Sequence, residues 1–145
     1  MKLITKLVSL IVFTCLTVSI VNAQSTGYRA RLSELPVSPQ TYRDITGVGE
    51  VFATLNGSTL SVNGSFEGMS SAASAAHVHN APKAMNGPPI GALEATPLPA
   101  GDVGGELELT AEQVEALRNE ELYIVIHSEN NPGGELRGWL FLTES

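Results

Sequence analysis

Cysteine is nearly absent from this chain, because Cys15 is the only one among 145 residues. It lies in an N-terminal segment, residues 1–23, in which Lys2 and Lys6 precede an apolar run that ends in compact residues. This pattern predicts a secretory signal peptide cleaved after residue 23. A retained membrane anchor is the alternative, although the apolar run is short for a membrane span. Cleavage removes the cysteine, so the predicted exported domain, residues 24–145, has no disulfide and depends on its core, with a bound metal as a further source of stability.

Basic residues are scarce as well. Of the 8 Lys and Arg residues, 2 (Lys2 and Lys6) belong to the predicted signal peptide, so the exported part carries 6 basic against 15 acidic residues, a net charge of -9. Such a surface repels nucleic acids and anionic membranes and favours cations or basic partners. The chain also lacks a nucleophile elbow, a phosphate loop and a clear pair of catalytic carboxylates. An enzyme is therefore less favoured than a binding protein, and the question stays open.

Short runs of alternating character follow one another along the exported part, separated by Gly, Pro, Asn and Asp. This spacing is typical of an all-β domain, an antiparallel sandwich or barrel of about eight strands. The predicted strands span residues 27–33, 47–55, 58–66, 74–80, 90–96, 104–110, 122–128 and 135–142.

Two turns and one helix have local signals. Asn56-Gly57 stands between two strand-like runs, where both residues must tolerate positive φ, and predicts a tight hairpin. The stretch "NNPGGE", residues 130–135, predicts the turn between the seventh and eighth strands. Thr110 and Gln113 form a capping-box pair, which predicts one short helix that covers an end of the sheets.

Three histidines are the main candidates for chemistry. His77 and His79 lie two apart in a predicted strand and therefore share a face, at a separation that two imidazoles can span to reach one ion. His127 ends the strand "LYIVIHS" and is the third histidine. Three imidazoles without a thiolate suit Cu(II) or Zn, and copper binds most strongly of the divalent ions. The alternative is that these histidines are hydrogen-bonded polar residues on a solvated sheet face.

Three residues near His127 could support such a site. Glu129 could fix a histidine tautomer as a hydrogen-bond partner. Glu135 and Arg137 share a face and form a possible site entrance, or else a surface ion pair worth under about 1 kcal/mol. Trp139, on the same alternation, is expected to pack in the core or at an interface.

The order of these motifs resembles the CHRD domain, first named from chordin and also found singly in secreted bacterial proteins. The likeness covers residues 27–142 and is most specific in "HVHNAP" and "IHSENNPGGELRGWL". It implies an all-β, immunoglobulin-like or Greek-key extracellular domain without an established enzymatic activity. In chordin this domain looks like a protein-interaction module for secreted growth factors, whereas any protein partner of this chain is unknown.

A more distant likeness is to the copper/zinc superoxide dismutases, which are Greek-key barrels. His77, His79, His127 and Arg137 occur in the order of that family's copper ligands and entrance arginine, and Asp102 stands in a similar glycine-rich turn. No histidine lies between His79 and His127, so the bridging ligand and the zinc histidines are missing. Three functions stay open: an exported module that stores, buffers or delivers one copper ion; a metal-free structural or adhesive module; and, with less support, a dismutase-like redox enzyme.

Overall fold

The computed structural model describes residues 25–34 and 38–143. The predicted signal peptide, residues 1–23, lies outside these residues. Among the described residues, no helix combines the length and apolar character that a membrane span requires.

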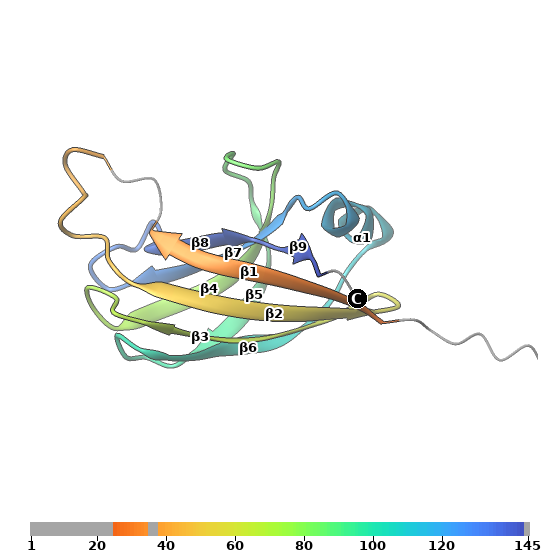
Figure 1. The fold of residues 1–145 in the computed structure, drawn as a ribbon, viewed down its shortest axis with the longest axis horizontal. Coiled ribbons are helices and arrows are strands. Elements are labelled where there is room, and N and C mark those ends of the chain that lie inside the picture. The colour runs from red at the N-terminus through yellow and green to blue at the C-terminus, as the bar shows by residue number, and fades with distance from the viewer. Residues whose placement is uncertain (1–24, 35–37, 144–145) are drawn as a thin grey trace, which may run out of the picture.

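Nine strands and one helix make up the fold (Figure 1). They are β1 (Thr26–Glu34), β2 (Val48–Asn56), β3 (Thr59–Glu67), β4 (Ala73–Asn80), β5 (Pro89–Ala95), β6 (Gly101–Glu108), α1 (Ala111–Arg118), β7 (Leu122–Ser128), β8 (Leu136–Trp139) and β9 (Phe141–Leu142). Eight antiparallel strands close into a barrel in the order β1-β2-β3-β6-β5-β4-β7-β8, and β9 pairs with β1. Because β3 pairs with β6 and β4 with β7, two connections cross over the barrel as in a Greek key. The predicted all-β architecture with one short helix is confirmed, in its barrel form.

The predicted hairpin and helix both form. Gly57 and Ser58 connect β2 to β3, one residue later than the predicted Asn56-Gly57 turn, because Asn56 still pairs with Thr59. Of the two predicted turn residues only Gly57 has a positive φ, of 63°. The Thr110 hydroxyl accepts a hydrogen bond from the Gln113 backbone, and the Gln113 side chain accepts one from the Thr110 backbone, which completes the capping box. The helix buries Leu117 against the barrel.

The last predicted strand, residues 135–142, is in fact two. Leu140 interrupts it: its side chain is fully buried and its backbone N–H donates to the Leu122 carbonyl. The chain after Leu140 therefore leaves β8 and pairs with β1 as β9. Alternation alone does not show this break, because the side-chain pattern continues through it.

One strand of the barrel, β7, is covered on both sides. Its inward residues, including Ile124 and Ile126, belong to the main core, and its outward Tyr123 and Val125 are also buried. These two pack with Ala81 and Trp139 in a second, smaller cluster. This second cluster partly shields the outer face of β4, β7 and β8 from solvent, and the histidines lie on that face.

Candidate metal site

The three histidines come from neighbouring strands. His77 pairs with Val125 and His79 with Tyr123, while His127 pairs with Ala75. His127 therefore lies diagonally beside His77 on the outer face of the sheet, at the spacing at which long side chains of adjacent strands meet. All three side chains are partly buried.

The imidazoles form one cluster. One nitrogen from each of His77, His79 and His127 lies within 4.8 Å of the others. The closest pair is His77 Nδ1 and His127 Nε2, 3.1 Å apart. Because ligands of a shared ion must converge in this way, the arrangement could hold a metal ion.

Backbone carbonyls fix the ring orientations. His79 Nδ1 lies 2.9 Å from the Gly87 carbonyl oxygen, and His127 Nδ1 lies 2.9 Å from the Pro132 carbonyl oxygen. A carbonyl only accepts, so both Nδ1 atoms carry the proton, and in the neutral rings both Nε2 atoms have a free lone pair. His77 Nδ1–H then donates to His127 Nε2. The partner of His127 is thus the Pro132 carbonyl, and Glu129 is exposed.

His79 Nε2 is the unusual atom of the cluster. It is buried, and it has no hydrogen-bond partner among the described residues. An unsatisfied buried polar atom costs about 1 to 3 kcal/mol, so proteins rarely keep one without a reason. A metal ion that accepts this lone pair is one such reason.

The cluster also favours the neutral form of His127. Burial lowers the pKa of this imidazole most, the nearby His77 and His79 lower it further, and the hydrogen bond to the Pro132 carbonyl opposes them only in part. Since a metal binds the unprotonated ring, the lowered pKa prepares His127 for coordination near neutral pH.

Aromatic rings support the site from β7 and β8. Tyr123 stacks on His79 with ring centroids 5.1 Å apart, and Trp139 packs on Tyr123 at 4.8 Å. The Tyr123 hydroxyl accepts from the Gly87 N–H and donates to the Gly87 carbonyl, so it holds the same residue that orients His79. Sequence reasoning missed Tyr123, although its alternation with His127 places both on one face.

The two predicted entrance residues, Arg137 and Glu135, lie in different surroundings, and only Arg137 is at the site. Arg137 lines a pocket of about 360 Å³ together with His79 and His127. Its guanidinium lies over the Trp139 ring, 4.7 Å from the centroid, and donates to the Asn86 side chain. Arg137 is thus at the pocket, packed on an aromatic ring rather than paired with a carboxylate.

Glu135 does not line this pocket. It is completely buried and joins three loops by accepting hydrogen bonds from the backbone of Thr46, from the backbone and hydroxyl of Ser70, and from the Asn131 side chain. Burial alone raises the pKa of Glu135, but the hydrogen bonds, including one from Ser128, lower it below its ordinary value. Glu135 therefore holds the loop that carries Pro132.

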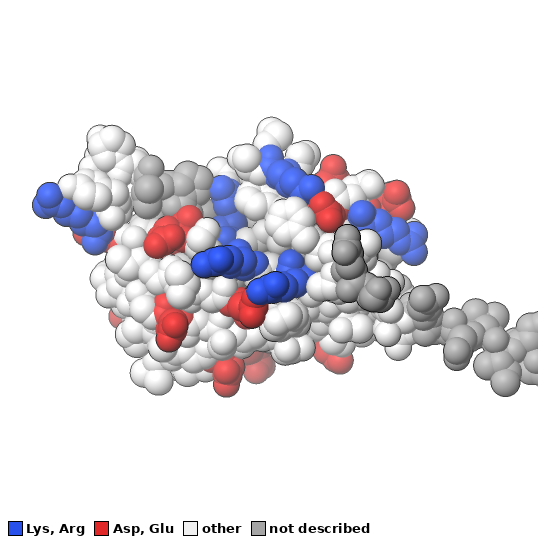
Figure 2. Space-filling view, in the orientation of Figure 1, with Lys and Arg blue, Asp and Glu red and all other residues white. Residues whose placement is uncertain are grey.

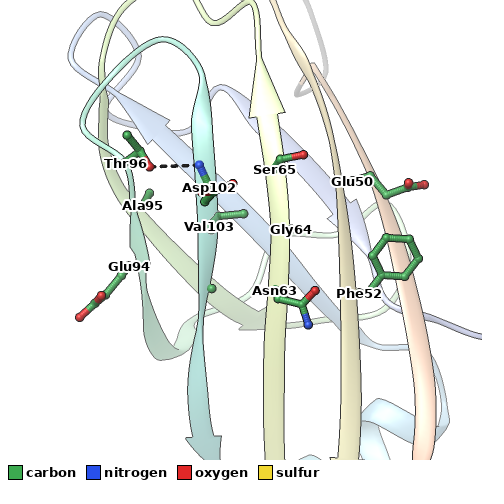
Figure 3. Close-up of a pocket in the computed structure, with 11 residues that line it drawn as sticks. Glu50, Phe52, Asn63, Gly64, Ser65, Glu94, Ala95, Thr96, Asp102 and Val103 are labelled. Atoms are coloured by element: carbon green, nitrogen blue, oxygen red, sulfur yellow. Dashed lines mark hydrogen bonds between the residues drawn. The ribbon is translucent and has the colours of Figure 1, made fainter.

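Asp102 lies elsewhere. It is on β6, which pairs with β3 and β5, and its side chain lines a different hollow with Ser65 and Glu94 (Figure 3). The Asp102 backbone N–H donates to the Thr96 hydroxyl. The structure thus gives Asp102 no place in the histidine cluster.

These features define an all-β barrel domain that carries a three-imidazole cluster with the capacity to hold a metal ion. The family model of the CHRD domain matches residues 28–140, and the chain belongs to this family. No curated protein and no solved structure matches the chain, so the likeness to superoxide dismutases has no support from either comparison.

Proposed function

We propose that this CHRD domain is an exported module that binds one copper ion through His77, His79 and His127, for storage, buffering or delivery. Export rests on the predicted signal peptide, residues 1–23, and the mass of the protein recovered outside the cytoplasm tests it. Recovery with residues 1–23 still attached contradicts cleavage.

The proposal of a metal ion rests on the unsatisfied nitrogen His79 Nε2. Hydrogen bonding accounts for the other nitrogens that face the cluster, whereas this one is buried without a partner among the described residues. A solvated polar cluster, the alternative interpretation, would leave that nitrogen in contact with water. Coordination gives the atom a partner and explains why Gly87 holds its ring in place.

The spacing of one pair of nitrogens suits a shared ion. Two adjacent imidazole nitrogens, each about 2.0 to 2.1 Å from a metal, are roughly 2.8 to 3.4 Å apart in square-planar or tetrahedral geometry. The separation of 3.1 Å between His77 Nδ1 and His127 Nε2 falls in this range, and the three nitrogens together lie within 4.8 Å of one another. The ligands would be His77 Nδ1, His79 Nε2 and His127 Nε2, because the remaining Nδ1 atoms are engaged by carbonyls. Coordination by His77 Nδ1 requires that its proton move to Nε2 of the same ring, so the ion replaces the hydrogen bond between His77 and His127.

Copper fits this ligand set best. Imidazole suits Cu, Zn and Ni, and affinity for a nitrogen site peaks at Cu(II) among the divalent ions. The chain has no fourth histidine, and its only cysteine lies in residues 1–23, so a second histidine-bound metal is not available. The proposal therefore stops at binding and includes no redox catalysis.

Copper titration of the metal-stripped protein tests the proposal. Trp139 is the only tryptophan and lies one ring beyond Tyr123 from His79. Paramagnetic Cu(II) at the cluster is expected to quench its fluorescence with a break at one equivalent. The paramagnetic resonance spectrum is expected to show splitting from imidazole nitrogens.

Matched variants make this test specific. His79→Phe is expected to abolish both signals, whereas Glu129→Gln, which removes an exposed carboxylate of the adjacent loop, is expected to retain them. Quenching of equal affinity in His79→Phe and the wild type would show adventitious copper and overturn the proposal. A parallel titration with Zn(II) measures the preference between the two ions.

A second candidate function, an extracellular interaction module without metal, has its own support. CHRD family membership suggests a binding module, and large apolar side chains such as Phe52 and Phe141 are exposed on the strands. Full retention of fold with no copper uptake would favour this function.

A further inference from the structure

One wall of the barrel has no cover. We call the outward side chains of β1, β2, β3 and β6 the open face; these strands lie side by side (Figures 1 and 3). Strand pairing arranges the open face in rows, of which the clearest runs Arg31, Glu50, Ser65, Asp102. The metal site lies on other strands, β4 and β7.

Large apolar residues interrupt the open face. Val48 and Phe52 alternate with polar residues on the outer side of β2 and are 44% and 46% exposed. Phe141, 44% exposed, pairs with Arg29 and extends the same row beyond β1. The solvent side of an antiparallel sheet is normally polar, so exposed apolar residues gathered on it indicate a contact surface.

The open face is also hollowed. Three adjoining pockets lie along it and share residues: Glu50 and Asp102 line the first two, and Arg29 and Arg31 line the last two. A surface with such depressions can receive side chains of a partner between its own.

Charge changes sign across the open face. Arg29 and Arg31 stand on β1, where Arg29 forms an ion pair with Glu50 of β2, while Asp102 and Glu106 stand on β6, with Glu94 beyond them on β5. In Figure 2 basic side chains gather over β1 and acidic ones follow towards the β3 and β6 side. No described residue forms an ion pair or hydrogen bond with the Arg31 side chain, so its charge is available to a partner.

We propose that the open face binds a second copy of this chain, related by a two-fold axis near Phe52. When the axis runs parallel to the strands between the two stacked faces, it reverses the order of the strands, so β1 of one copy lies over β6 of the other. Arg31 of each copy then faces Asp102 of the partner, so this contact occurs twice in each dimer, as an isologous interface requires. A purely basic or purely acidic partner would match only one half of the face. This inference is independent of the proposed copper site.

The area of the open face limits the expected affinity of the dimer. β1 to β6 spans three strand spacings of about 4.8 Å, and nine residues along a strand extend about 30 Å. Each copy therefore contributes roughly 400 to 600 Å², near the lower limit for a specific interface. We expect a reversible dimer with a dissociation constant in the micromolar range and a marked dependence on salt.

Sedimentation analysis from about 1 to 500 μM, with a chelator present, tests the dimer independently of copper binding. Arg31→Glu and Asp102→Arg are each expected to weaken the dimer roughly tenfold or more, because each reversal changes two symmetry-related contacts. The double variant Arg31→Glu, Asp102→Arg is expected to recover most of the lost affinity. Phe52→Ser is expected to weaken the dimer without changing its salt dependence.

Arg118→Glu is the matched control, since it reverses an exposed charge on α1, away from the open face. It is expected to leave the dimer unchanged, and circular dichroism checks that each variant is folded. A monomer throughout the concentration range overturns the proposal. A dimer that responds equally to Arg118→Glu and Arg31→Glu, or that the double variant does not restore, overturns it as well.

Discussion

The variant His79→Phe separates two effects of the unsatisfied His79 Nε2: its cost to the stability of the metal-free protein and its proposed role as a copper ligand. Phenylalanine keeps a flat ring against Tyr123, which stacks on His79 at a centroid distance of 5.1 Å, and it has no nitrogen. Removing the unsatisfied Nε2 recovers about 1 to 3 kcal/mol. Losing the bond from Nδ1 to the Gly87 carbonyl costs about 0.5 to 1.5 kcal/mol, and that carbonyl still accepts from the Tyr123 hydroxyl. The metal-free variant is therefore expected to be more stable than the wild type, by about 1 kcal/mol.

Copper is expected to reverse this order. At free copper 100 times the dissociation constant, binding to the folded state is expected to add about 2.7 kcal/mol to the free energy of unfolding of the wild type and nothing to that of His79→Phe. Urea denaturation with a chelator, and again with buffered copper, measures both differences. His79→Leu provides a second variant in case the phenylalanine ring does not fit.

Two outcomes would contradict this reasoning. If both His79→Phe and His79→Leu lose more than about 1 kcal/mol without metal, His79 Nε2 is satisfied in solution and the argument from the orphaned atom fails. If either variant gains as much stability from copper as the wild type does, the ion binds elsewhere. Glu129→Gln is expected to match the wild type in both series.

Three further predictions concern the fold. Glu135→Gln places an amide against backbone donors and is expected to lower the free energy of unfolding at pH 7 by about 1 to 3 kcal/mol. Because the pKa of Glu135 is lowered in the folded state, its stabilisation is present above the unfolded pKa of about 4.3 and is lost as pH falls through the folded pKa. Urea titrations from pH 7 to 3 are therefore expected to show a weaker acid dependence in the variant. Gly64→Ala drives a methyl group into the Glu50 carbonyl on β2 and is expected to cost about 1 to 3 kcal/mol in urea denaturation, whereas Gly57→Asn, at a turn with nothing within 4 Å, is expected to cost less than about 1 kcal/mol. Thr110→Ala removes the helix cap and is expected to cost about 1 kcal/mol, with Thr110→Ser close to the wild type in thermal unfolding.

The sequence predicted the convergence of the histidines only in part. Alternation puts His77 and His79 on one face, and the end of a neighbouring strand was the natural place for His127. Which strands are neighbours is a matter of topology, and the alternation of β7 does not specify that it pairs with β4. That adjacency was suggested by the resemblance, and the register is shown by the structure.

Glu135 shows why the rest of the site was not predictable. A glutamate is almost never fully buried unless it is paired, and its partners here come from positions as distant as Thr46 and Ser70. Arg137, two residues away, does line the pocket beside the histidines. Alternation predicted that Glu135 and Arg137 share a face, but Glu135 precedes β8, where the alternation of the strand no longer applies. The hydrogen bonds from the histidines to the Gly87 and Pro132 carbonyls could not be predicted either, because any residue type offers a backbone carbonyl.

The double cover of β7 has a consequence for how long the domain lasts. A strand paired on both edges and buried on both faces opens only when the whole domain unfolds, so the amide hydrogens of Ile124 and Val125 are expected to exchange most slowly with solvent. His127 belongs to that strand. Proteolysis and loss of the histidine cluster are therefore expected to share one barrier, so the described domain, which contains no cysteine, would keep any bound ion for as long as it stays folded.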